Sequence, residues 1–592
     1  MIKPVVSGIC GFVSFDSNFY FCIYNHFMQF CELIMNLKSI CKAAACLLCF
    51  TSGTLVSHGV PAKPGPIMTV TSSGEVVEIY KHGDEHFHYI SDKDGNVLVK
   101  DAVGDLYFAM SSNGVPVTSG IRYSTQFKGV APLHVSDMTV PQQAKVSRVA
   151  PEAVELPFKS EGELHTLIIL VQYQDVKFSV ANINKEVDCQ LNEAGYSKGG
   201  ATGSARDYFQ YSSNGKFSPT FDVYGPVTLS QNRAYYGGND RSGNDLHPAE
   251  MVSEGVRLLD NEVNFSDYDI DGDGEVDNVY VIYAGVGESD TDVEESVWPH
   301  AHRLEYAGIS NCHLDGVKIN SYACSSELDW ESRLNGIGTL CHEFSHVLGL
   351  PDLYQTGSLP ALEGAPGYFS VMSYGTYNDD GRTPPAYTAW ERYVMGWLEP
   401  AELSATQDIT LRCIDEEGYN DSYIIRSPYD NEYWILENRQ PLGWDKPLGA
   451  SGIDAHGMLV WHIDYDHREW VSNSLNNNPS HPRVDIVEAH GNALNSPWLA
   501  PFPGAANKTE WTDITTWKKD AMPYALKTIQ EQGTLVHFRF EVDASGIDDV
   551  TADEDAPVEF FNLHGEKVAD PHGTPGVYIR RQGSKTQKVM VN

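Results

Sequence analysis

Basic residues are scarce in this sequence. Its 592 residues include 41 Lys and Arg against 80 Asp and Glu, which gives a formal net charge of -39 at pH 7. Such a chain repels nucleic acids and anionic membrane surfaces, whereas it attracts divalent cations. We therefore expect no nucleic-acid partner.

Long apolar runs are missing as well. A membrane-spanning helix needs about 20 consecutive apolar residues, and no segment after the leader reaches that length. The short apolar run from Ala43 to Phe50 follows two lysines and precedes small polar residues, which is the order of a secretory signal. We expect a leader over 1–59, with translation starting at Met35 and a signal peptide over 35–59. An N-terminal membrane anchor is the alternative.

Cysteine is rare beyond this leader. Six of the 11 cysteines precede Thr51, and the other five are spread thinly at Cys189, Cys312, Cys324, Cys341 and Cys413. A sparse, odd set excludes disulfides as the main support of the fold. Cys312 and Cys324 are candidates for one disulfide across a hairpin, and Cys341 is expected to be a buried thiol.

The chain is long enough for several domains, because single cores rarely exceed about 300 residues. Alternating apolar residues with DG and NG turns predict a β-rich module over 60–150. A buried strand from Leu164 opens a second domain, 151–400, and further alternating segments predict a β-sandwich over 401–545. An acidic linker and a short β module follow over 546–592.

One segment, TLCHEFSHVLGLPDLY from Thr339 to Tyr354, carries a metal-ligand pattern. Residues four apart share a face of a helix, so His342 and His346 can bind one zinc ion. Glu343 lies one step round the helix, where it can act as general base on a metal-bound water. The alternative is that the HExxH pattern arises by chance and that His342 and His346 are ordinary core or surface residues.

The residues after the second histidine extend this pattern. Gly349 can take a positive φ and end the helix, which lets Asp352 return as a third ligand and leaves the fourth position for water. In the later SVMSYG, Met372 is expected to form an apolar floor below the metal. Tyr374 is expected to direct its phenol at the ion or at a developing oxyanion.

A second constellation, DIDGDGEVD, favours a calcium ion. Alternating carboxylates around a glycine turn suit an oxygen-preferring cation. The expected ligands are Asp269, Asp271, Asp273 and Asp277, with the backbone carbonyl of Glu275. A solvated acidic turn is the alternative.

Several stretches resemble the immune inhibitor A family of secreted bacterial metalloproteases, among them SARDYFQYSSNGKFSPTFDVYGPVTL, WPHAH and PPAYTAWERYVMGWL. The HExxHxxGxxD motif with its methionine turn resembles the metzincin clan, many of whose members have a histidine where Asp352 stands. The resemblance implies an α+β fold with a metzincin-like catalytic domain, built of a mixed twisted sheet and an active-site helix. It also implies a propeptide over 60–150, accessory β-domains and zinc-dependent endoproteolysis of proteins.

A propeptide must block the open metal position, and no cysteine lies between Thr51 and Ala150 to do so. YKHGDEHFH is faintly similar to the aspartate switch of astacin propeptides, which makes Asp84 the candidate. His82, His86 and His88 are rival ligands, and an ordinary turn is the further alternative.

The last module ends in KVMVN and resembles the C-terminal sorting domains of Bacteroidota type IX secretion, which implies an export machinery as partner. A capping hairpin is the alternative. The sequence thus predicts a secreted zinc endopeptidase made as a zymogen, with the cell surface as a second location. A surface adhesin on an inactive protease fold and a glycopeptide-directed metallohydrolase are the competing functions.

Overall fold

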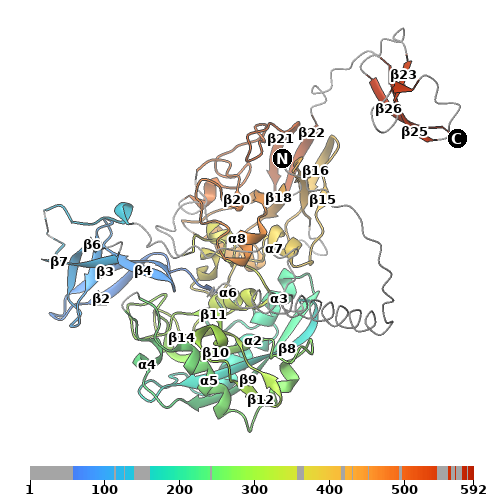
Figure 1. The fold of residues 1–592 in the computed structure, drawn as a ribbon. Helices are drawn as coiled ribbons and strands as arrows, with labels where there is room; N and C mark the ends of the chain where they lie inside the picture. The colour runs from blue at the N-terminus through green and yellow to red at the C-terminus, as the bar shows by residue number, and fades with distance from the viewer. Residues whose placement is uncertain are drawn as a thin grey trace, which may run out of the picture. The chain divides into compact units, whose positions relative to one another are not determined.

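The computed structural model describes residues 58–112, 115–125, 127, 129–138, 160–240, 243–356, 366–414, 421–429, 431–450, 452–491, 496–542, 558–561, 567–568, 576–582 and 585–591. The predicted start at Met35 and the signal peptide up to residue 57 lie outside the described residues. The fold is mixed α+β, with several sheets and few helices (Figure 1). No described helix has the length and hydropathy that a membrane span requires.

The N-terminal module is a six-stranded antiparallel sheet in which each strand pairs with the next along the chain. Its strands are β2 (Pro66–Val70), β3 (Val76–Asp84), β4 (Phe87–Ser91), β5 (Val97–Lys100), β6 (Leu106–Ser112) and β7 (Val115–Arg122). Alternate residues of a strand face one side of a sheet, so Val77 and Ile79 of β3 are buried in one apolar cluster with Leu98 and Phe108. A two-residue strand that precedes this sheet, β1 (His58–Gly59), pairs elsewhere.

The second domain is built on a mixed sheet of order β1-β11-β14-β10-β8-β9. Parallel pairing joins β8 (Gly162–Gln172), β9 (Phe217–Thr228), β10 (Val279–Val286) and β14 (Ser321–Leu328). Strand β11 (His300–Arg303) lies between β1 and β14 and runs antiparallel to both. A small hairpin, β12 (His313–Leu314) and β13 (Val317–Lys318), lies between β11 and β14 in the sequence.

Both faces of this sheet are covered, which explains the unbroken apolar run of β8. Ile168 and Leu170 pack in one core cluster with residues of α2 (Ile183–Asn192), α3 (Ala205–Ser212) and α6 (Gly338–Val347). Leu167 and Ile169 pack in another cluster with residues of α4 (Arg233–Gly237) and α5 (Pro248–Leu258).

Two further sheets form the accessory domain. One has the order β15-β17-β18-β19-β20 and the other β16-β22-β21. Their bounds are β15 (Ala401–Glu402), β16 (Gln407–Leu411), β17 (Tyr423–Arg426), β18 (Glu432–Arg439), β19 (Gly457–Asp464), β20 (Val484–Ile486), β21 (Tyr524–Gln532) and β22 (Leu535–Val542). Trp434 and Leu436 of β18 share a core with Phe538 and Phe540 of β22, so the two sheets pack face to face.

The opposite face of the five-stranded sheet joins the core of the catalytic helix. Ile435 and Trp461 belong to the cluster that contains α6 and α7 (Ala389–Val394). A short helix, α8 (His467–Val471), follows β19. The shared core means that the accessory domain and the helix of the metal motif stabilise one another.

The remaining elements are short. The 3-10 helices are η1 (Val135–Asp137), η2 (Lys198–Gly200), η3 (Phe265–Tyr268), η4 (Leu304–Ala307), η5 (Gly367–Phe369), η6 (Tyr374–Tyr377), η7 (Gly443–Gly449) and η8 (Pro497–Leu499). The C-terminal module has an antiparallel sheet of β24 (Lys567–Val568), β23 (Val558–Phe561), β25 (Gly576–Gln582) and β26 (Lys585–Val591).

The expected disulfide is wrong. Cys312 and Cys324 are both free thiols, as are the other three cysteines of the described residues. The Cys324 sulfur on β14 instead lies 3.6 Å from Nδ1 of His300 on the neighbouring strand β11. Cys341 is buried, as predicted.

Candidate metal centre

The helix α6 carries His342, Glu343 and His346 and is buried along its whole length. Apolar residues surround the three polar ones on every side, which is typical of a helix inside a core. The helix stops because Gly349 has a φ of 101°, a conformation that glycine adopts without strain. The chain then turns back toward the helix and brings Asp352 to its histidines.

Three ligand atoms converge at this point. His342 Nε2 and His346 Nε2 are 3.1 Å apart, and Asp352 Oδ1 lies 3.1 Å from the first and 3.3 Å from the second. Ligands about 2.0 Å from a tetrahedral zinc ion are separated from one another by about 3.3 Å. The observed spacing therefore fits three ligands of one zinc ion.

The hydrogen bonds of the two rings fix which nitrogens face inward. His342 Nδ1 lies 2.7 Å from the carbonyl oxygen of Val371, and His346 Nδ1 lies 2.8 Å from that of Leu350. Because a carbonyl only accepts, each Nδ1 carries the proton and each Nε2 presents a lone pair. Two lone pairs and a carboxylate oxygen directed at one point require a cation, and this donor set suits zinc.

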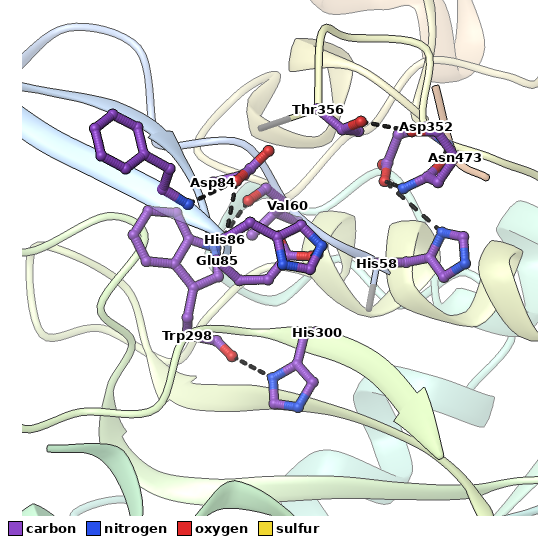
Figure 2. A network of polar contacts seen from close by, with 12 residues as sticks. His58, Val60, Asp84, Glu85, His86, Trp298, His300, Asp352, Thr356 and Asn473 are labelled. Carbon is purple, nitrogen blue, oxygen red and sulfur yellow. Dashed lines mark hydrogen bonds and ion pairs between the residues drawn. The ribbon is translucent and has the colours of Figure 1, made fainter. Parts of the chain in front are cut away.

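A residue that the sequence did not suggest holds the carboxylate ligand. Asn473, just beyond α8, donates from Nδ2 to Asp352 Oδ2 and accepts at Oδ1 from the Asp352 backbone N–H at 2.7 Å (Figure 2). Burial alone would raise the pKa of Asp352, but the imidazoles of His346 and His342 lower it below its usual range. Asn473 is 121 residues away in sequence; its one local signal is a φ of 49°, which asparagine tolerates.

Glu343, the candidate base, is a buried polar residue of α6 next to His342. Its side chain is fully buried, and Oε1 accepts a hydrogen bond from the backbone N–H of Val60 at 3.0 Å. Its Oε2 accepts none from the residues that the structure describes. Burial, reinforced by the charges of Asp352 and Glu85, raises the pKa of Glu343 well above its usual value.

The methionine turn packs against the ligand loop. Met372 is buried in the same core cluster as α6, and its carbonyl accepts from the N–H of Leu353 at 2.8 Å. Tyr374 opens η6 and packs in a small cluster with Tyr354 and the partly buried Tyr368. Tyr354, which the sequence did not single out, donates its phenol proton to the carbonyl oxygen of Gly59.

The suggested switch residue Asp84 ends β3. Its Oδ1 accepts from the backbone N–H groups of His86 at 2.9 Å and Phe87 at 3.2 Å, which closes the turn into β4 (Figure 2). Another N-terminal residue, His58, lies beside the centre: its ring and the ligand atoms of His346 and Asp352 lie within 4.8 Å of one another. The Nδ1 atom of His58 lies 3.9 Å from Asp352 Oδ2, and its ring centroid is 4.6 Å from that of His346.

The rival histidines have other partners. His82 lies 2.8 Å from the Ser91 hydroxyl, His86 lies 3.3 Å from a Glu85 carboxylate oxygen, and His88 lies 3.2 Å from one of Glu288.

The acidic turn gathers three carboxylates. Oxygen atoms of Asp269, Asp271 and Asp273 lie within 4.8 Å of one another. Asp277 instead accepts from the N–H of Ile270 at 2.9 Å, and burial with the three neighbouring charges raises its pKa to about 6.

The Glu275 side chain points away from this cluster. It pairs with Arg303 and, at 3.3 Å, with Lys318. Only its carbonyl oxygen remains for a cation in the acidic turn.

Comparisons with known proteins show what this part of the chain is similar to. Residues 173–398 match the immune inhibitor A peptidase M6 catalytic domain. The pre-pro-metalloprotease PrtV of two Vibrio cholerae serotype O1 strains is 25% identical over 340 residues, covering 48% of this chain and 36% of the relative. Immune inhibitor A of Bacillus thuringiensis subsp. alesti is 24% identical over 266 residues, covering 38% of each chain.

The chain thus matches little more than a third of the length of these curated relatives. The matched residues contain α6, the Asp352 loop and the methionine turn, the same elements that assemble the centre. Residues 173–398 are therefore similar to the catalytic domain of the immune inhibitor A peptidase family.

Proposed function

We propose that this chain is a secreted zinc-dependent endopeptidase that hydrolyses proteins and is made as a zymogen. The observation that carries the proposal is the convergence of two histidine lone pairs and a carboxylate beside a buried glutamate that is not a ligand. Zinc bound by His342, His346 and Asp352 would polarise a substrate carbonyl and acidify a water molecule.

Glu343 performs the proton transfers in this mechanism. As a carboxylate it takes a proton from the attacking water, and as the acid it returns that proton to the leaving amine. Its Oε1 lies 3.0 Å from a peptide nitrogen, that of Val60, which is within proton-transfer distance.

The same elements support the finer fold assignment that we propose. A metzincin-like arrangement is supported by the antiparallel strand β11, by α6 and by Met372 in the core cluster of α6. A propeptide over 60–150 is supported by the contact of Val60 with Glu343. Asp84 is the carboxylate proposed from sequence to maintain latency.

Four further features complete the proposal. Calcium in the acidic turn is supported by the three clustered carboxylates. Secretion follows from the predicted signal peptide, and the module over 546–592 is proposed to address the chain to an export machinery. Protein substrates follow from the family.

The test is hydrolysis of an unlabelled protein mixture, with cleaved bonds identified by mass spectrometry. Activity should disappear with a zinc chelator and return with added zinc. Glu343→Ala should keep the metal, measured by elemental analysis, and lose nearly all turnover, whereas His342→Ala should lose the metal. A wild-type protein that holds zinc yet cleaves nothing would instead favour an adhesin on an inactive fold.

A further inference from the structure

A short segment of the chain extends the catalytic sheet. His58 and Gly59 form β1, which pairs antiparallel with β11 in the register His58 with Ala301 and Gly59 with His300. An extended peptide added to an exposed sheet edge is a common way for proteins to bind peptides. This segment is therefore bound as a peptide ligand of the catalytic domain.

Further contacts hold the backbone beyond β1. The Trp298 indole N–H donates to the carbonyl oxygen of Val60 at 2.9 Å (Figure 2). The Tyr377 phenol donates to that of Pro61 at 2.7 Å. The N–H of Lys63 donates to Ser289 at 2.9 Å. All of these hydrogen bonds involve main-chain atoms of the segment, and every peptide substrate has such atoms.

One peptide bond in this segment is held at both of its polar atoms. The carbonyl oxygen of Gly59 accepts from the Tyr354 phenol, and the nitrogen of Val60 donates to Glu343 Oε1 at 3.0 Å. The preceding side chain, His58, lies beside the metal ligands His346 and Asp352.

These partners match the demands of hydrolysis. The water oxygen bonds to the carbonyl carbon, the C–N bond breaks, and the proton taken by the glutamate passes to the leaving nitrogen. Negative charge develops on the carbonyl oxygen and needs a fixed hydrogen-bond donor. The Gly59 oxygen faces such a donor, and the Val60 nitrogen faces the group that moves the proton.

We propose that Gly59–Val60 occupies the position of the bond to be cleaved, and that Tyr354 is the catalytic donor to the carbonyl oxygen of that bond. The proposal rests on the proposed endopeptidase function and adds a residue to its machinery. It assigns to Tyr354 the oxyanion role that the sequence suggested for Tyr374.

The surroundings of Tyr354 support a fixed donor. The residue is buried, lies two positions beyond the ligand Asp352, and stacks on His342 with ring centroids 6.5 Å apart. Tyr374 packs against it in the same cluster. A phenol fixed by packing before the substrate arrives has little reorganisation to undergo during the reaction.

The position of Gly59 also restricts what can occupy this place. A Cβ atom there would lie 2.7 Å from Glu85 Oε2 and 2.8 Å from the carbonyl oxygen of Pro299. Glu85 belongs to the N-terminal module, whereas Pro299 belongs to the catalytic domain. In the precursor, therefore, only glycine fits at position 59 without a shift of its neighbours.

The test compares two phenol deletions in the full chain after its own maturation. Tyr354→Phe should lower kcat about 100-fold, the usual loss for one oxyanion donor, with KM changed less than about threefold. Tyr368→Phe removes a phenol from the same cluster and should leave both constants within about twofold of wild type. Elemental analysis should find the same zinc content in both variants.

Binding of the precursor segment gives a second measurement. A synthetic peptide with the sequence of residues 57–64, SHGVPAKP, should inhibit the matured enzyme competitively, and Tyr354→Phe should change this inhibition less than about threefold, in keeping with its small effect on KM. The assignment is overturned if Tyr354→Phe keeps the wild-type kcat, if both phenol deletions lose it equally, or if Tyr374→Phe alone loses it. An inactive wild-type enzyme would overturn the proposed function itself.

Discussion

Asn473 of the accessory domain hydrogen-bonds the metal-ligand candidate Asp352. Removing its side chain should weaken zinc binding. The side chain is buried and makes two hydrogen bonds to Asp352, one to the carboxylate and one to the backbone N–H. Loss of a hydrogen-bond partner behind a metal ligand typically weakens metal binding about 10- to 100-fold. At about 1.4 kcal/mol per tenfold, that is about 1.4 to 2.8 kcal/mol.

The substitution to make is Asn473→Gly, because the residue has a φ of 49° and alanine would add backbone strain. Asn477→Ala is the matched control, since its amide lies in the same loop and donates to the hydroxyl of Thr356 at 3.0 Å. Zinc affinity is measured by competition with a chromogenic chelator, with circular dichroism to confirm folding. Equal affinities in Asn473→Gly and wild type would refute the argument that this amide orients the ligand.

Three further outcomes are expected. Calcium should raise the melting temperature of the zinc-loaded enzyme, because the clustered aspartates repel one another without a cation; an identical melting temperature in a calcium chelator would leave the turn a solvated loop. Burial raises the pKa of Asp485 to about 7, so its contribution to stability is present below about pH 4 and is lost as the pH rises through 7. Asp485→Asn should accordingly have a higher melting temperature than wild type at pH 8 and the same melting temperature at pH 4. Thermal scans in which the two proteins differ by the same amount at both pH values would contradict a raised pKa of Asp485. Deleting 546–592 should preserve purified activity and leave the protein in the periplasm of its host, whereas normal export of the truncated chain would rule out a sorting function.

The central motif is predictable because its geometry is local. Four-residue spacing on a helix places His342 beside His346, and a glycine that ends the helix brings Asp352 back within a few residues. The buried strand β8 is equally visible, because both faces of its sheet are covered and its segment Leu167–Val171 is apolar throughout.

Long-range partners are not visible in the same way. Asn473 lies 121 residues from Asp352, and Val60 lies 283 residues from Glu343. No sequence spacing predicts either contact, because each depends on how separate sheets pack. The mistaken disulfide has a related cause, since proximity in sequence does not fix the direction of a side chain, and Cys324 lies against His300.

The choice between the two tyrosines shows where sequence reasoning ends. Tyr354 lies two residues beyond a metal ligand and Tyr374 lies two residues beyond Met372, so each has a local reason to face the centre. The deciding observation is the path of the backbone at His58–Gly59, which pairs with β11. On that path the carbonyl oxygen of Gly59 reaches the phenol of Tyr354. A catalytic donor is defined by the atom it faces in the bound peptide, and the position of that atom depends on the fold of the whole sheet.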